Sequence, residues 1–251
     1  MSLESWNVII GGSSGLGRAL AQEYAQSKKN ILLISRDAQD LSVLASDLSL
    51  RFGVQASYLE CDITSPHFQP QDLMQKILSI CPGIESFNLV AGGSFPEDDH
   101  IPSYDALKKS LDLNFYGPAQ TLIALLKSYD QHQVKTILVV TSIACIRPRS
   151  SNVSYTSSKV ALESFTLSLQ HSAFQSGLNI SFQIMRMGYM ESIFTKNKKL
   201  LFPVASPQNV AHFLVQNRDK NLGVFYFPKF WSLIAMILNY VPYFLFKRLR
   251  F

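Results

Sequence analysis

The chain has 251 residues, a hydrophobic content of 47% and a net charge of +5 from 23 basic and 18 acidic side chains. This length suits one α/β domain with a full-sized core, and the hydrophobic content excludes a disordered chain. The basic residues are dispersed apart from residues 196–199 and 247–250, and neither cluster belongs to a nucleic-acid-binding module. We therefore expect no nucleic-acid partner.

The first predicted elements are a strand at residues 6–10, a glycine-rich turn and a helix at residues 18–25. A turn of this kind between a strand and a helix places backbone N–H groups and a helix N-terminus where they can hold a pyrophosphate. The predicted phosphate-binding residues are Gly11, Ser13, Ser14, Gly15, Leu16, Gly17 and Arg18.

Strands and helices alternate through the rest of the chain. Further strands are predicted at residues 30–35, 55–60, 87–91, 135–141, 179–185 and 223–227, with helices at 38–51 and 70–79 and between the later strands. This alternation predicts a Rossmann-like, doubly wound α/β fold with a seven-stranded parallel sheet and helices on both faces. Ligands are expected at the carboxyl ends of the strands. We assign residues 1–228 to this domain and residues 229–251 to a hydrophobic, helical C-terminal tail.

Three cysteines, Cys61, Cys81 and Cys145, form an odd set without the spacing of metal ligands. No secretory leader precedes the first predicted strand. We expect no metal site and a reducing, cytoplasmic location.

Tyr155 and Lys159 lie four residues apart on a predicted helix, and Ser142 lies thirteen residues before Tyr155, where a strand ends. Positions i and i+4 share a helix face, so the lysine ammonium can approach the phenol. The ordinary tyrosine pKa of about 10 is too high for acid-base work at neutral pH, and a neighbouring cation can lower it. These residues predict a hydride-transfer site.

The glycine spacing G-x-x-x-G-x-G (Gly11, Gly15, Gly17), Ser142 and Y-x-x-x-K together resemble a short-chain dehydrogenase/reductase over roughly residues 6–228. The resemblance implies that Tyr155 donates a proton to a carbonyl oxygen and that Ser142 polarises the carbonyl. It implies that Lys159 lowers the pKa of Tyr155 and holds the nicotinamide ribose, and that Asn114, near a proline kink, completes a proton path. It also implies a homodimer or homotetramer.

The resemblance further assigns the nicotinamide cofactor. Arg36 follows Ser35 at the end of the second strand, where relatives that use NAD usually carry an acid. A guanidinium matches a 2′-phosphate in charge and shape, so NADP(H) is implied, with Arg18 as a second contact. The alternatives are that Arg36 is a solvated surface residue, or that the adjacent Asp37 serves NAD.

Other cofactor contacts implied by the resemblance follow later strands. They are Asp62 and Ile63 at the adenine, Ala91, Gly92 and Gly93 after the fourth strand, Tyr155 and Lys159 at the ribose, and Gly188 and Ser192 at the nicotinamide. Leu89-Val90 and Met187 depart from the family pattern, which usually has asparagines and a proline there. Residues 194–206 are the predicted substrate lid.

From Phe230 to Phe246 the chain carries no charge, and a basic cluster follows. The run is shorter than the roughly 20 apolar residues of a membrane-spanning helix, and Asn239 and Pro242 divide it into two short helices. Aromatic residues beside basic ones favour peripheral contact with the cytosolic face of an anionic membrane. The alternatives are packing on a partner subunit or on the protein's own sheet, and a true membrane span.

The sequence therefore predicts an NADP(H)-dependent oxidoreductase that interconverts a ketone and a secondary alcohol, with an apolar or lipid-like substrate. One alternative is a non-catalytic NADP(H)-binding sensor or membrane-associated scaffold. A second is a long-chain 3-keto-lipid reductase of the sphingoid-base type.

Overall fold

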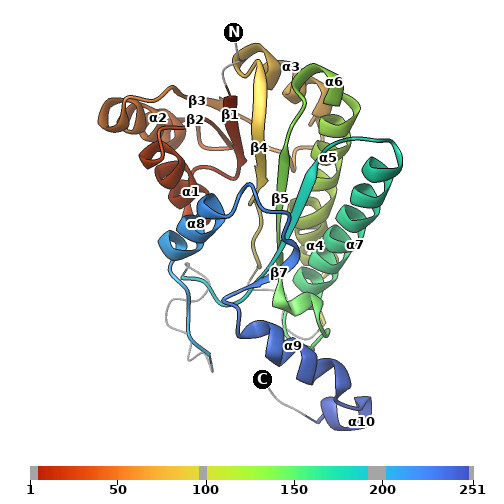
Figure 1. Ribbon diagram of the computed structural model, residues 1–251. Helices are drawn as coiled ribbons and strands as arrows, with labels where there is room; N and C mark the ends of the chain where they lie inside the picture. The colour runs from red at the N-terminus through yellow and green to blue at the C-terminus, as the bar shows by residue number, and fades with distance from the viewer. Residues whose placement is uncertain (1–4, 96–100, 192–201, 249–251) are drawn as a thin grey trace.

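The structure is a computed structural model that describes residues 5–95, 101–191 and 202–248. Its centre is a seven-stranded sheet in the order β3-β2-β1-β4-β5-β6-β7, in which every neighbouring pair is parallel (Figure 1). The predicted doubly wound α/β fold is confirmed. The strands are β1 Ser5–Ile10, β2 Asn30–Ser35, β3 Ala56–Glu60, β4 Gly83–Leu89, β5 Thr136–Ser142, β6 Ser181–Met187 and β7 Gly223–Phe227.

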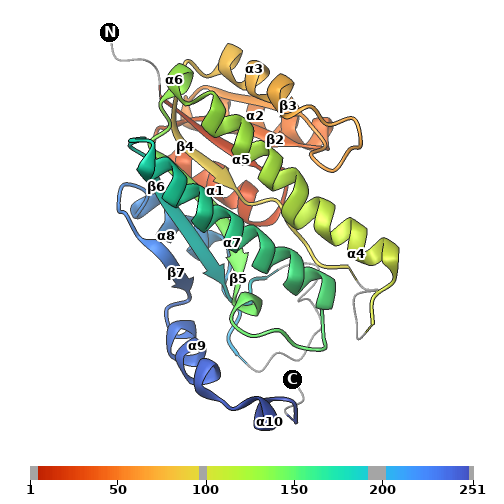
Figure 2. The ribbon, with the colours of Figure 1, turned by 90° about the vertical axis from the view of Figure 1, so that its right-hand side faces the viewer.

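Helices cover both faces of the sheet (Figures 1 and 2). One face carries α1, α2 and α8, and the other carries α3, α5 and α7. The helices are α1 Gly15–Gln26, α2 Ala38–Phe52, α3 Pro70–Ile80, α4 Tyr104–Leu111, α5 Gly117–Lys127, α6 Tyr129–His132, α7 Val153–Gln175, α8 Pro207–Gln216, α9 Trp231–Tyr240 and α10 Tyr243–Phe246, with a π-helix at Asp112–Tyr116 and a 3-10 turn at Ile143–Cys145.

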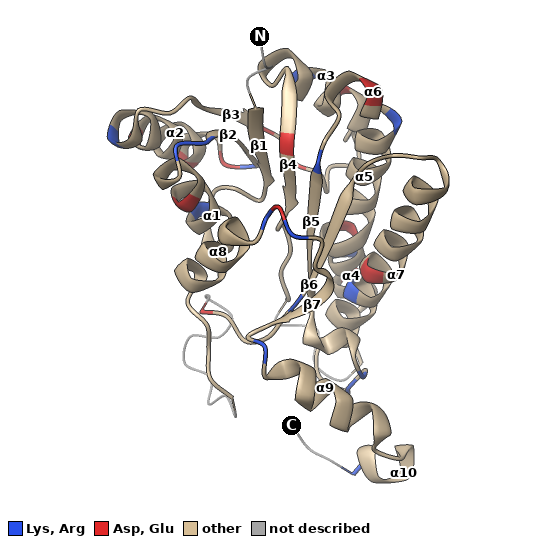
Figure 3. Cartoon of the chain, viewed as in Figure 1, with Lys and Arg blue, Asp and Glu red and all other residues tan. Residues whose placement is uncertain are grey.

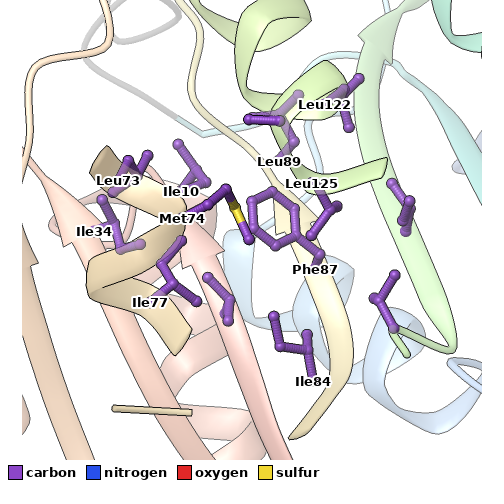
Figure 4. Packing of buried hydrophobic residues seen from close by; sticks show 14 of the residues in the cluster. Ile10, Ile34, Leu73, Met74, Ile77, Ile84, Phe87, Leu89, Leu122 and Leu125 are labelled. Atoms are coloured by element: carbon purple, nitrogen blue, oxygen red, sulfur yellow. The ribbon is translucent and has the colours of Figure 1, made fainter. Parts of the chain in front are cut away.

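The central strands read as apolar runs because both faces of the sheet are buried. Along β1, Val8 and Ile10 belong to the core under α3, α5 and α7, whereas Ile9 belongs to the core under α1, α2 and α8. Figure 4 shows Phe87 of β4 beside Met74 of α3 and near Leu125 of α5. Successive side chains point to opposite faces, so one continuous run supplies both layers.

Strand β4 begins at Gly83, four residues before the predicted start at residue 87. Glu85, Ser86 and Asn88 interrupt the apolar pattern on which the prediction depended. Ser86 Oγ donates to Asn7 Oδ1 over 2.7 Å, and Asn88 Nδ2 donates to the Val8 carbonyl oxygen over 3.0 Å. These hydrogen bonds satisfy buried polar groups, which is the condition for polar residues inside a sheet.

The helical stretch that contains Asn114 is interrupted by the π-helix at Asp112–Tyr116. The sequence indicated a kink caused by Pro118. In the structure Pro118 follows the π-helix inside one continuous helical stretch from α4 to α5, so its missing N–H removes a helical hydrogen bond next to the irregularity. The irregularity takes the form of one turn of π-helix, a feature common at functional sites.

The C-terminal tail forms α9 and α10 beyond the carboxyl ends of the strands (Figures 1 and 2). The predicted break occurs between Tyr240 and Tyr243, where Pro242 lies. Within the described ranges, every helix is too short or too polar to cross a membrane.

Candidate active site

The glycine-rich turn closes tightly over the end of β1. The N–H groups of Gly11 and Gly12 donate to the carbonyl oxygen of Ile34 over 2.8 and 3.2 Å, so the turn is joined to β2. Gly11 has a φ of +95°, and a Cβ atom on Gly17 would lie 2.0 Å from the Gly11 carbonyl oxygen. Both positions therefore require glycine.

The N-terminus of α1 points its first N–H groups out of this turn. Ser14 is the N-cap residue, and in the described structure its side chain makes no capping hydrogen bond. The positive end of the helix dipole and the uncapped N–H groups suit a phosphate. The residues present thus fit the pyrophosphate of a dinucleotide.

The two arginines expected at the adenosine end both lie beside this turn and are exposed. Arg18 Nε donates to the Ser13 carbonyl oxygen over 3.0 Å, and Arg36 follows β2 directly. Asp37, which raised the alternative of NAD, is the N-cap of α2 and accepts from the Asp40 N–H over 2.9 Å. Helix capping is thus a sufficient structural role for Asp37.

Asp62 organises the turn that follows β3. Its Oδ1 atom accepts from the N–H and the hydroxyl of Thr64 over 2.9 and 2.7 Å. The next residue, Ile63, is buried, and its carbonyl oxygen would lie 2.3 Å from a Cβ on Gly117. The turn is thereby fixed against the start of α5.

Asn114 and Lys159 meet where the chain leaves β4. The side chain of Asn114 is fully buried, accepts from the Gly93 N–H and donates to the Gly93 carbonyl oxygen, each over 2.9 Å. A Cβ on Gly92 would lie 2.7 Å from Lys159 Nζ and 3.0 Å from Asn114 Oδ1. The π-helix, the end of β4 and α7 thus bring both predicted residues together around Gly92 and Gly93.

Ser142 and Tyr155 form the adjacent part of the site. Ser142 is buried at the end of β5, where its Oγ accepts from the Ala144 N–H over 3.1 Å, and its hydroxyl is hydrogen-bonded to the Tyr155 side chain. Burial raises the pKa of Tyr155, and the Ser142 hydrogen bond opposes that rise. The hydroxyl and phenol therefore act as one hydrogen-bonded pair facing the carboxyl edge of the sheet.

Lys159 differs from expectation in its electrostatics. Its Nζ donates to the Val140 carbonyl oxygen over 3.0 Å, and burial lowers the pKa of Lys159 to about 8. We expected this ammonium to lower the pKa of Tyr155, but in this structure burial dominates and the pKa of Tyr155 is raised. Spacing along the helix predicted the shared face correctly, yet it did not include the desolvation that both groups undergo.

The lowered pKa of Lys159 predicts that Lys159→Met stabilises the fold at neutral pH. A shift from 10.5 to about 8 corresponds to roughly 3 kcal/mol against folding, partly offset by the roughly 1 kcal/mol of the Val140 hydrogen bond. The unfolded chain binds more protons between these two pKa values, so the penalty is complete below pH 8 and disappears as the pH rises to 10.5. Urea unfolding at several pH values would measure the difference in unfolding free energy between Lys159→Met and the wild type. A difference that does not become smaller as the pH rises contradicts the lowered pKa of Lys159.

A partly buried ion pair that we did not predict lies next to the site. Glu163, one turn after Lys159 on α7, accepts from Arg186 Nε over 3.1 and 3.0 Å and from the Thr141 hydroxyl over 3.0 Å. Arg186 also donates to the Tyr226 hydroxyl. Glu163 continues the i, i+4 spacing of Tyr155 and Lys159, and that spacing could have shown that it faces the sheet.

The chain after β6 packs against the tail. A Cβ on Gly188 would lie 2.1 Å from Trp231 Nε1, so glycine is required here for Trp231 to pack. Tyr189 and Phe202 make edge contacts with the Trp231 ring at centroid distances of 5.6 and 4.8 Å. Ser192 and residues 194–201 of the predicted lid lie outside the described residues. The two ends of this loop are joined by a bridge between Met190 and Ala205.

Arg147, in the loop between Ser142 and Tyr155, holds the other end of the tail. Its guanidinium donates to the carbonyl oxygens of Leu238 and Val241 and lies over the Phe246 ring, 4.3 Å from the centroid. These carbonyls belong to the C-terminal end of α9, which a cation stabilises. The tail is therefore packed on its own domain at the active-site edge, one of the alternatives that the sequence left open.

We expect Arg147→Ala to release the tail. Charge-assisted hydrogen bonds contribute about 1.5–3 kcal/mol, so the opened form should increase about tenfold or more, and chymotrypsin should cleave within residues 230–246 correspondingly faster. The matched control is Arg51→Ala, which removes another arginine stacked on an aromatic ring, at Phe52. Equal cleavage rates for both variants would show that Arg147 does not hold the tail.

Comparison with known proteins places the chain in a family. The model of the short chain dehydrogenase family matches residues 5–200. Inactive hydroxysteroid dehydrogenase-like protein 1 of Homo sapiens is 24% identical over 214 residues, which are 84% of this chain and 64% of that protein. The chain thus spans about two thirds of the length of this relative. Very-long-chain 3-oxoacyl-CoA reductase of Bos taurus is 25% identical over 88% of this chain and 70% of that protein.

Solved structures of other proteins have a similar fold. L-sorbose reductase from Gluconobacter frateurii, complexed with NADPH and L-sorbose, has a TM-score of 0.76 at 20% identity and covers 88% of this chain and 94% of its own. An alcohol dehydrogenase from Thermococcus sibiricus, complexed with 5-hydroxy-NADP, has a TM-score of 0.75 at 22% identity and covers 88% and 95%. Together with the family model and the site geometry, these matches show that the chain belongs to the short-chain dehydrogenase family of oxidoreductases.

Proposed function

We propose that the protein is an NADP(H)-dependent oxidoreductase that reduces a ketone to a secondary alcohol. The observation that carries the proposal is the convergence of Asn114, Ser142, Tyr155 and Lys159 at the carboxyl edge of the sheet, beside the glycine-rich turn. A nicotinamide cofactor, when bound, supplies the hydride for the carbonyl carbon.

The chain's own residues manage the proton and the developing charge. Ser142 donates a hydrogen bond to the carbonyl oxygen, which becomes negative as the carbonyl is reduced. Tyr155 donates its phenolic proton to that oxygen. Lys159 keeps an ammonium close to this site, and its bond to the Val140 carbonyl and its closeness to Asn114 Oδ1 orient it. Asn114 fixes the chain at Gly93 and completes the proposed proton path.

Arg36 is the proposed contact for the 2′-phosphate of NADP(H), with Arg18 as the second cation. We expect purified protein to bind NADPH more tightly than NADH, as measured by nicotinamide fluorescence, and Arg36→Ala to weaken NADPH binding about tenfold to a hundredfold. Arg51→Ala, at an exposed arginine near the C-terminal end of α2, is the matched control. If neither cofactor binds, the proposed reaction is wrong; if Arg36→Ala binds NADPH like the wild type, the phosphate contact is wrong.

The proposed substrate is apolar or lipid-like. Two similar proteins, from Bos taurus and Acinetobacter baylyi, are described as a very-long-chain 3-oxoacyl-CoA reductase and a fatty acyl-CoA reductase. Their names support a long acyl chain on the carbonyl compound and keep a long-chain 3-keto-lipid reductase as a specific form of the proposal. A screen of ketones that differ only in chain length, with NADPH, tests it.

A second candidate function is a non-catalytic cofactor-binding sensor or scaffold. It is favoured by the similar human protein, which is described as inactive. The presence of Asn114, Ser142, Tyr155 and Lys159 in one site argues against it, because a pure binder has no use for a proton donor. Absence of turnover with tight NADPH binding would favour the scaffold.

We also propose a cytoplasmic homo-oligomer with peripheral membrane contact through residues 229–251. The oligomer is an analogy with the family, and sedimentation velocity tests it.

A further inference from the structure

The tail has two different faces. Trp231 and Ala235, one turn apart on α9, are buried against the domain and are 3% and 2% exposed. On the same helix Leu233, Ile237 and Tyr240 are 57%, 55% and 83% exposed. The exposed apolar residues continue into α10, and we call them together the outer face: Leu233, Met236, Ile237, Tyr240, Tyr243, Phe244 and Leu245.

The inner face is held at both ends by contacts that leave the outer face uncovered. Trp231 packs on Gly188 at one end, and Arg147 binds the carbonyl oxygens of Leu238 and Val241 at the other. With both contacts in place Leu233 and Ile237 remain more than half exposed, so these contacts hold the tail without covering the outer face. Contiguous exposed apolar surface of this kind marks a site of interaction with a membrane or a protein.

The chain's excess of positive charge lies in the C-terminal segment that contains this face, although Lys220 precedes β7 and is separated from α9 by that strand. Residues 220–251 contain five Lys and Arg and no Asp or Glu, whereas the remaining 18 basic residues are balanced by 18 acidic ones. The net charge of +5 therefore belongs entirely to this segment. Figure 3 shows no Asp or Glu on α9 or α10. Lys229 precedes the outer face, and Lys247 and Arg248 follow it and are exposed.

An apolar face flanked only by cations is complementary to an anionic lipid surface, in which acyl chains lie beneath negative headgroups. Tyrosines at positions 240 and 243 add side chains that suit the membrane interface. A second copy of this chain would present the same excess of positive charge, so pairing of two outer faces would bring like charges together. The observations thus favour lipid over self-association.

We propose that the outer face docks on an anionic membrane and directs the active-site edge of the sheet toward the bilayer. Trp231 contacts the glycine after β6, and Arg147 lies between Ser142 and Tyr155, so the docked tail adjoins the site. The substrate class is an apolar carbonyl compound that reaches the site from the bilayer. This substrate rests on the proposed reaction, but the docking itself does not.

Docking is tested by cosedimentation of the full chain with phosphatidylcholine vesicles, with and without phosphatidylglycerol. We expect binding that requires the anionic lipid and weakens with salt. Lys247→Gln/Arg248→Gln should lower the partition coefficient about thirtyfold, and Leu233→Glu/Ile237→Glu should lower it about a hundredfold or more. Matched controls at exposed sites elsewhere are Lys108→Gln/Lys109→Gln on α4 and Val43→Glu/Leu50→Glu on α2, which should bind as the wild type does.

Either of two results overturns the docking proposal. One is wild-type protein that does not cosediment with anionic vesicles. The other is a Leu233→Glu/Ile237→Glu variant that keeps vesicle binding but dissociates an oligomer in sedimentation velocity, which would make the outer face a subunit interface. NADPH binding, followed by fluorescence on the same samples, distinguishes failure of the docking proposal from failure of the proposed reaction. Protein that binds vesicles but not NADPH would reject the reaction and leave the docking proposal intact. Long-chain ketone reduction that vesicles do not affect would reject delivery from the bilayer.

Discussion

Tyr155→Phe is expected to lower the turnover of any ketone that the wild-type protein reduces by about two to four orders of magnitude. The substitution keeps the ring and removes the phenolic proton donor that is hydrogen-bonded to Ser142. Because Ser142 stays in place, the carbonyl is still polarised and some activity remains. Steady-state rates of NADPH oxidation with a medium-chain ketone give the measurement, and single-turnover rates show whether the loss is in the chemical step.

The control for this experiment is Tyr58→Phe, which removes a phenol from the exposed side of β3. NADPH affinity should be unchanged in Tyr58→Phe and at most about tenfold weaker in Tyr155→Phe, which loses one hydrogen bond to the ribose but keeps the ring. Near-native turnover of Tyr155→Phe would mean that another group supplies the proton. The assignment of the catalytic set would then be wrong.

Glu163→Ala is expected to destabilise the fold by about 1.5–3 kcal/mol, the range for hydrogen bonds to charged groups, because the Arg186 side chain left behind is only partly buried, at 23% exposed. The variant leaves Arg186 of β6 without the carboxylate that accepts from its Nε and Nη2 atoms, and it removes one acceptor of the Thr141 hydroxyl. Glu163 raises the pKa of Arg186 in the wild type, and the substitution removes that effect. Arg186 still stays charged, because an arginine in a protein is protonated at any ordinary pH. Urea unfolding followed by circular dichroism gives the free energy.

Two further variants show whether the loss of stability in Glu163→Ala comes from the unpaired charge of Arg186 or from lost packing. Asp47→Ala breaks the exposed pair with Arg51, which has a 3.0 Å contact and side chains 44% and 54% exposed, and should cost less than about 1 kcal/mol. Glu163→Leu combined with Arg186→Met removes both charges and should recover much of the stability that Glu163→Ala loses. If Glu163→Ala and Asp47→Ala destabilise the protein equally, the buried pair has no special role in the fold.

The site was largely predictable because its residues lie at strand ends or at fixed spacings. Tyr155 and Lys159 share a face of α7, and the strand-turn-helix order alone indicated a phosphate-binding turn at residues 11–17. The start of β4 was predicted wrongly because Ser86 and Asn88 interrupt its apolar pattern. Their hydrogen-bond partners lie on β1 and α1, which no local pattern shows.

The pKa values of Tyr155 and Lys159 could not be inferred from spacing either. Both depend on how much water the surrounding elements exclude, and Lys159 is nearly buried between α7, the π-helix and the sheet. The orientation of the C-terminal tail could not be predicted from local sequence either. Its apolar composition and its break at Pro242 were evident, but which side chains face outward depends on the contacts of the tail with Gly188 and Arg147, which are distant in sequence.

The parallel α/β fold, the glycine turn, the polar residues at the strand ends and the excess of positive charge after residue 219 are all evident from the amino-acid sequence. These follow from periodicity, spacing and composition, which are local properties of the chain. By contrast, the pairing of Glu163 with Arg186 and the binding of Arg147 to the tail, more than 90 residues away, became evident only in the folded chain. Such pairs form because the sheet order places β5, β6 and β7 side by side, and each charge or polar group that is buried there requires a partner.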